Sequence, residues 1–154
     1  TFRAFDTRLG GANREALTDV LRLFFEAGGT LIDTSPMYGR AEAVIGELLA
    51  GASFQSQAFL ATKVWTNGRK RGIRQMQDSL AKLQRPSIRL MQVHNLVDCE
   101  TQLETLRIWK DEGPEKINHF EFRDSELSNP FEIWVGVGKY WRHWIFSKFP
   151  PSLT

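Results

Sequence analysis

Thr30-Leu31-Ile32-Asp33-Thr34-Ser35-Pro36-Met37-Tyr38-Gly39 is the stretch of sequence that decides the fold. A short apolar run ends in the carboxylate of Asp33, and a loop bounded by Pro36 and Gly39 then presents the phenol of Tyr38. A strand that delivers polar groups at its carboxyl end is typical of α/β proteins, which place their chemistry there. We therefore expect a buried strand followed by a functional loop.

The same arrangement recurs twice further along the chain. Residues 59–63 and 88–94 are apolar runs that close on one ionisable residue each, Lys63 and His94. Asp33, Lys63 and His94 follow one another at intervals of 30 and 31 residues, close to the roughly 30 residues of a βαβ unit. The three side chains are therefore predicted to occupy equivalent places in a repeating unit.

Helical patterns separate these runs. Residues 13–27, 41–50 and a segment after Gly68 carry apolar residues at helical spacing, and a further helix is expected after Asp98 as N-cap. The first of these helices is expected to bury one face, made of Leu17, Val20, Leu21, Phe24 and Phe25. Strands and helices thus alternate, which predicts an α/β fold: part of a (β/α)8 TIM barrel, with about three βα units after a preceding helix.

The sequence changes character after Gly113. Residues 114–154 hold nine of the eighteen aromatic residues without any sustained period, which predicts an irregular, aromatic-rich C-terminal tail behind a partial barrel at 1–113. Two interpretations stay open. The tail covers part of an incomplete barrel, or it is disordered and derives from a frameshift, a splice variant or a truncated gene. The first residues also suggest that the sequence begins inside a longer protein.

Composition narrows the classes of function. The chain has 154 residues, 42% of them hydrophobic, and a net charge of +2 with its basic residues spread along the sequence. No nucleic-acid partner is expected from this pattern, and no apolar run is long enough to span a membrane. A single cysteine, Cys99, fits a reducing compartment and a cytoplasmic location. No metal site is expected, because Asp33, Glu42 and His94 form no compact ligand motif.

The polar residues suggest carbonyl chemistry. In a parallel barrel the carboxyl ends of adjacent strands meet at one mouth, so Asp33, Lys63 and His94 should lie near one another, with Tyr38 above them. We expect Lys63 to lower the pKa of Tyr38 and make it a general acid, Asp33 to pair with Lys63, and a neutral His94 to position a carbonyl. A nicotinamide cofactor would have to supply hydride. Taken singly, Asp33, Lys63 and His94 would more often have a turn, surface or structural role, and Tyr38 could simply pack against its loop. The repetition of three ionisable groups at one structural phase is what favours a functional mouth.

These residues resemble the aldo-keto reductase family. The likeness rests on residues 28–39 with Glu42 and Gly46, on 61–64, and on 91–95, and it covers roughly residues 12 to 113. The resemblance implies a (β/α)8 barrel, NADPH as the usual cofactor, and a small-molecule aldehyde or ketone as substrate. It assigns catalysis to Asp33, Tyr38, Lys63 and His94, and places Asp33 and Asn95 near the cofactor.

The family's first strand and its later βα units, which carry most cofactor contacts, have no counterpart here. The resemblance therefore implies an NADPH-dependent oxidoreductase by descent whose truncated chain binds cofactor poorly. The alternative is a non-catalytic, barrel-derived binding or regulatory module. In that case an exposed sheet edge would dock a partner or a second copy of the chain.

Overall fold

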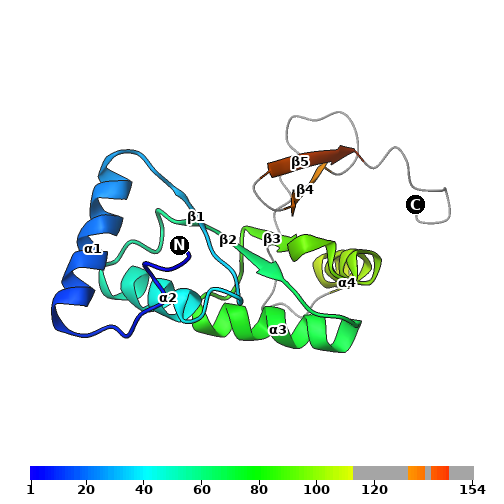
Figure 1. Cartoon of the computed structure of the whole chain (residues 1–154), viewed down its shortest axis with the longest axis horizontal. Coiled ribbons are helices and arrows are strands. Elements are labelled where there is room, and N and C mark those ends of the chain that lie inside the picture. Colours follow the sequence, from blue (N-terminus) through cyan, green and yellow to red (C-terminus); the bar gives the residue numbers. More distant parts are fainter. Residues whose placement is uncertain (113–131, 138–139, 146–154) are drawn as a thin grey trace.

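Three parallel strands with a helix after each form the body of the chain, seen in a computed structural model that describes residues 1–112, 132–137 and 140–145 (Figure 1). The strands lie in the order β1-β2-β3 and comprise β1 (Leu31–Asp33), β2 (Phe59–Val64) and β3 (Leu90–Val93). The helices are α1 (Gly11–Glu26), α2 (Ala41–Gly51), α3 (Arg69–Lys82) and α4 (Cys99–Glu112), with a 3-10 turn η1 (His94–Leu96) before α4. The predicted partial α/β barrel with a preceding helix is confirmed.

The strand register fixes which side chains share a face. Asp33 lies opposite Ala61, and Lys63 lies opposite Gln92. Because side chains alternate along a strand, Lys63 faces away from Thr62 and Val64, which pack toward the helices. The pairing of β3 begins at Leu90, so this strand starts two residues later than the apolar run from residue 88 suggested.

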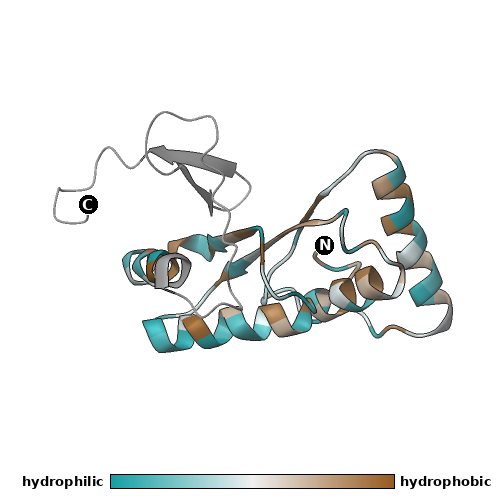
Figure 2. Ribbon diagram, turned by 180° about the vertical axis from the view of Figure 1, so that it is seen from behind, coloured by the Kyte–Doolittle hydropathy of each residue, from teal (hydrophilic) through white to brown (hydrophobic). Residues whose placement is uncertain are grey.

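The helices α2 and α3 lie side by side along one face of the sheet, and α4 follows next to α3 (Figure 1). One core cluster joins α1, α2 and the first two strands, and a second joins Val64, Met76, Met91 and Leu106 between β2, β3, α3 and α4. Figure 2 shows α3 as largely hydrophilic with separate hydrophobic bands, as an amphipathic surface helix requires. The helical layer thus holds the strands from one side.

The helix α1 differs in part from its predicted face. Leu21 and Phe25 are buried, but Val20 is 52% exposed, together with Leu23 at 57%. The spacing of apolar residues predicts which of them share one face of a helix. Whether that face is buried depends on a neighbouring element that packs against it. No element in the described part of the chain covers Val20.

The tail is more regular than predicted in the part that the structure describes. The strands β4 (Glu132–Val137) and β5 (Tyr140–Ile145) pair antiparallel, and β4 lies beside β3 and η1. Aromatic and β-branched residues favour strands even without clean alternation, which explains the difference. The expectation that residues 114–154 are disordered or derive from a frameshift stays a prediction, and residues 113–131, 138–139 and 146–154 lie outside the described residues. In the described part of the chain, no helix is long and apolar enough to cross a membrane.

Gly46 tests the packing of α2 against the end of α3. A Cβ atom at this position would lie 2.3 Å from the carbonyl oxygen of Lys82 and 2.8 Å from Cα of Leu83. Because both are backbone atoms, Gly46→Ala should lower the free energy of unfolding by about 1–3 kcal/mol in urea titrations. Gly51→Ala in the last turn of α2 is the matched control, since a Cβ atom there would lie 3.9 Å from a guanidinium nitrogen of Arg14. Equal stability of the two variants would contradict this packing.

Candidate functional site

The carboxyl ends of the three parallel strands bring the predicted polar residues together. Asp33 is the last residue of β1, Lys63 is the residue before the last in β2, and His94 directly follows β3. Tyr38 lies in the loop between β1 and α2. The three regularly spaced residues therefore lie along one edge of the sheet, which we call the rim, formed by Asp33, Lys63 and His94 together with Tyr38.

An ion pair between Lys63 and Asp33 forms the centre of this rim. The ammonium Nζ of Lys63 lies 2.6 and 2.8 Å from the two carboxylate oxygens of Asp33, and it donates to the carbonyl oxygen of Thr34 at 2.8 Å. The side chain of Lys63 is 7% exposed and that of Asp33 is 35% exposed. Burial lowers the pKa of Lys63, and the charge and hydrogen bonds of Asp33 oppose this effect. The expected pairing is present.

The ring of Tyr38 lies beside this pair. Nζ of Lys63 is 5.5 Å from the ring centroid, and the ring of Phe2 packs against Tyr38 at 5.1 Å between centroids. The expectation that Lys63 lowers the pKa of Tyr38 is wrong. Burial, followed by the charge of Asp33, raises the pKa of Tyr38. The physical reason is that Asp33 offsets the charge of the ammonium, which leaves desolvation as the dominant effect.

The loop that carries Tyr38 is held by short-range hydrogen bonds. The amide of Tyr38 donates to the carbonyl oxygen of Ser35 at 3.0 Å, and the amide of Ala41 donates to the carbonyl of Tyr38 at 3.0 Å. Gly39 has φ +58°, and a Cβ atom there would lie 2.2 Å from a carboxylate oxygen of Asp6. That carboxylate accepts from the amide of Arg40 at 3.0 Å. Glycine is therefore required where the loop turns into α2.

His94 completes the set from β3. Burial, and next the charge of Lys63, lower the pKa of His94, while Asp33 raises it. The balance favours the neutral imidazole at pH 7, as expected from the sequence. The indole of Trp65 lies against this imidazole edge-on, with 6.5 Å between ring centroids.

Sequence reasoning missed the residues that surround these four. Trp65 follows β2 directly, and the side-chain amide of Gln75 accepts from its backbone N–H at 2.5 Å and donates to its carbonyl at 3.2 Å. The available signal was the position of Trp65, two residues after Lys63 and directly after the predicted strand. Phe2 carried no such signal, because only the folded chain brings the N-terminal segment onto Tyr38.

Glu42 supports the site from behind the sheet. This residue of α2 is 1% exposed, and its carboxyl oxygen accepts from the hydroxyl of Thr62 at 2.6 Å. Thr62 precedes Lys63 in β2, so the contact fixes α2 to the strand that carries the lysine. The negative charge of Glu42 also raises the pKa of Lys63, as the smallest of the contributions.

Two further residues border the rim. Asn95 is exposed and has φ +53°, a left-handed conformation that asparagine tolerates better than most residues. The carboxylate of Asp98, the residue before α4, accepts from the amide of Gly68 at 2.6 Å and so ties the loop before α3 to the loop before α4. The pKa of the neighbouring Cys99 thiol is raised by burial, which keeps it protonated and argues against a reactive thiol. Among the residues that the structure describes, no three His, Cys, Asp or Glu side chains group as metal ligands.

Chemically, this rim combines an acid, a cation and a neutral imidazole. The phenol of Tyr38 keeps its proton near neutral pH, because its pKa is raised. Lys63 supplies a fixed ammonium, and His94 can donate one hydrogen bond in its neutral form. Such a set can protonate an oxygen that gains negative charge.

Comparison with known proteins gives consistent results. A family model described as the aldo/keto reductase family matches residues 2–120, a range wider at both ends than the resemblance noted above. Aldo-keto reductase YhdN of Bacillus subtilis is 32% identical over 122 residues, which cover 70% of this chain and 37% of that protein. Methylglyoxal reductase YeaE of Escherichia coli is 37% identical over 87 residues, which cover 54% of this chain and 30% of that protein.

Solved structures agree with these relatives. An aldo-keto reductase from Klebsiella pneumoniae in complex with NADPH aligns with a TM-score of 0.62 and 26% identity, over 73% of this chain and 40% of that chain. The chain therefore spans well under half the length of the relatives described here.

The pKa of His94 tests the electrostatics of the rim. Because Lys63 lowers this pKa and Asp33 raises it, Lys63→Met should raise the pKa of His94 and Asp33→Asn should lower it. Proton NMR titration of the imidazole measures both shifts, with His94→Gln to assign the signal among the three histidines. Shifts of the same sign in the two variants would contradict the arrangement.

Proposed function

Because this chain belongs to the aldo/keto reductase family, we propose that its rim carries the catalytic groups of an NADPH-dependent reductase of aldehydes or ketones. The observation that carries the proposal is the ion pair of the buried Lys63 with Asp33, in which the ammonium lies near the ring of Tyr38 and lowers the pKa of His94. A surface lysine would not be desolvated and matched to one carboxylate in this way. The names of the relatives, which include a methylglyoxal reductase, favour a small carbonyl substrate.

The proposed mechanism gives each residue one role. Tyr38 donates its hydroxyl proton to the carbonyl oxygen, which becomes the hydroxyl of the product alcohol. Lys63 offsets the charge of the phenolate that remains, and Asp33 holds Lys63 in place. His94 donates a hydrogen bond to the carbonyl oxygen and orients the substrate. NADPH, when bound, supplies the hydride that the carbonyl carbon receives.

The residues present fit the reactive end of this cofactor only in part. Asp33 keeps 35% of its side chain exposed beside the ammonium, and Asn95 is exposed next to His94, so both could meet polar atoms near the nicotinamide. Two polar side chains provide only a small part of the contacts that hold a dinucleotide cofactor. We therefore extend the proposal: the 154-residue chain by itself binds NADPH weakly and turns over little substrate.

A cofactor titration and an assay of the purified 154-residue chain test this proposal. We expect the amide signals of Asn95 and His94 to shift with NADPH with a dissociation constant no tighter than about 1 mM, roughly 4 kcal/mol of binding. Any reduction of a simple aldehyde should fall by about 100-fold or more in Tyr38→Phe, with unchanged unfolding, because the acid is lost. Efficient turnover by the unmodified chain would contradict the impairment, and activity that survives in Tyr38→Phe would contradict the assigned acid.

A second function, a binding module that associates with another copy of itself, is favoured by the outer edge of β1. Among the described residues this strand ends the sheet on one side and carries Leu31, which is 55% exposed. The carbonyl of Asp33 on this edge already accepts from the hydroxyl of Thr1 at 3.0 Å, so the open part of the edge lies at Leu31. An open strand edge with an exposed apolar side chain is a template for pairing with another strand. We propose this edge as the contact in a non-catalytic role.

Size-exclusion chromatography with light scattering distinguishes the two functions. If the edge of β1 pairs, the chain should form dimers whose fraction rises with concentration, and Leu31→Lys should return them to monomers, because a charge blocks edge pairing. Leu96→Lys is the matched control, since Leu96 is 42% exposed but lies in η1. A monomer at all concentrations would count against the binding module.

A further inference from the structure

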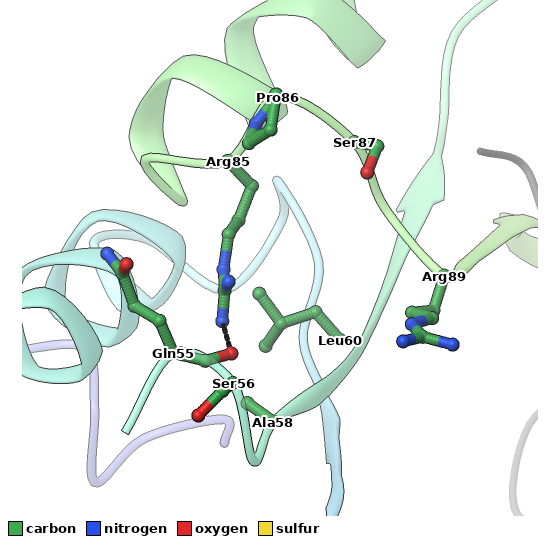
Figure 3. Close-up of a pocket in the computed structure, with 8 residues that line it drawn as sticks. All are labelled: Gln55, Ser56, Ala58, Leu60, Arg85, Pro86, Ser87 and Arg89. Carbon is green, nitrogen blue, oxygen red and sulfur yellow. Dashed lines mark hydrogen bonds between the residues drawn. The ribbon is translucent and has the colours of Figure 1, made fainter. Parts of the chain in front are cut away.

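A cavity of about 220 Å³ lies at the amino ends of β2 and β3, at the opposite end of these strands from Lys63 and His94. It opens between the segment before β2 and the segment that links α3 to β3 (Figure 3). We propose that this cavity is a binding site for a small oxyanion of the phosphate type, held by the guanidinium of Arg85. The cavity shares no residue with the rim, and anion binding there does not depend on the proposed reductase activity.

Arg85 provides an unused donor inside the cavity. Its guanidinium extends across the cavity to the carbonyl oxygen of Gln55, to which one terminal nitrogen donates (Figure 3). The Nε–H of the same group is buried and has no partner among the described residues. A buried donor without an acceptor lowers the stability of the fold, because its lost hydrogen bond to water is not replaced. A bound anion that accepts from this N–H would restore that hydrogen bond.

The charge of Arg85 also lacks a matching carboxylate in this cavity. The lining residues include two arginines, Arg85 and Arg89, and no aspartate or glutamate. Burial lowers the pKa of Arg85, and in the described part of the chain no carboxylate acts against this effect. Because a guanidinium keeps its charge at any ordinary pH, an anion is the ligand that this environment favours.

The remaining lining residues point to a tetrahedral anion rather than a planar carboxylate. Ser56 comes from the segment before β2 and Ser87 from the segment before β3, so their hydroxyls can donate from different walls (Figure 3). The guanidinium of Arg85 and the two hydroxyls together offer more donors than the two oxygens of a carboxylate can use. The apolar side chains of Leu60 and Pro86 complete the wall and reduce water near the charge, which strengthens a charge-assisted hydrogen bond.

NMR of the whole 154-residue chain tests the site directly. Inorganic phosphate is titrated at constant ionic strength against chloride, and the Nε–Hε signals of the arginines are followed. We expect the signal of Arg85 to shift with saturation, and the signal of Arg74, which is exposed on α3, to shift little and without saturation. Acetate should bind at least about tenfold more weakly than phosphate, because it carries one charge and two oxygens. A non-saturating shift of Arg85, or equal shifts at both arginines, would overturn the proposal.

Variants give an independent measurement by thermal unfolding. Phosphate should raise the Tm of the unmodified chain and of Arg74→Met, but not that of Arg85→Met. Arg85→Lys keeps the positive charge and the aliphatic stem and lacks the Nε donor, so phosphate affinity should fall about tenfold even if Arg85→Met folds poorly. Phosphate binding by Arg85→Lys as tight as in the unmodified chain would overturn the role given to this guanidinium.

Discussion

The ion pair between the buried ammonium of Lys63 and the carboxylate of Asp33 is the interaction on which the rest of this structure depends. Lys63 is 7% exposed, and it survives in charged form because Asp33 and the carbonyl of Thr34 replace its lost hydration. The two partners belong to neighbouring strands, so the pair exists only when β1 and β2 run parallel in the observed register. The ion pair of the site therefore depends on the same strand pairing that defines the fold. The hydrogen bond from Thr62 to Glu42 adds to this by fixing α2 to β2 next to Lys63.

The ion pair also determines how its neighbours behave. Because Asp33 offsets the charge of Lys63, the phenol of Tyr38 is desolvated without being ionised, and its pKa rises. The same ammonium is close enough to lower the pKa of His94. An acid that holds its proton and a neutral imidazole thus belong to one rim near the same ammonium, and the proposed carbonyl reduction rests on this combination. Family membership and this geometry are the two observations on which the proposed function rests.

The sequence predicted what repeats and missed what depends on distant partners. The spacing of Asp33, Lys63 and His94 predicted three parallel strands and a common rim, since the βα repeat is a local property of the chain. The exposure of Val20 and the pKa of Tyr38 could not be predicted, because the first depends on which element covers α1 and the second on how strongly Asp33 offsets a nearby charge. Phe2 on Tyr38, and the donor of Arg85 at the opposite end of the sheet, likewise arise only from contacts between remote segments.

The pKa of Lys63 itself is the most direct test of this account. It can be followed in the chain labelled with ¹³C at lysine Cε, with Lys63→Met to assign the signal. We expect a pKa below 10.5 and a further decrease in Asp33→Asn, because burial lowers the pKa of Lys63 and Asp33 opposes that effect. A pKa at or above 10.5 that does not change in Asp33→Asn would show a solvated lysine and contradict the account.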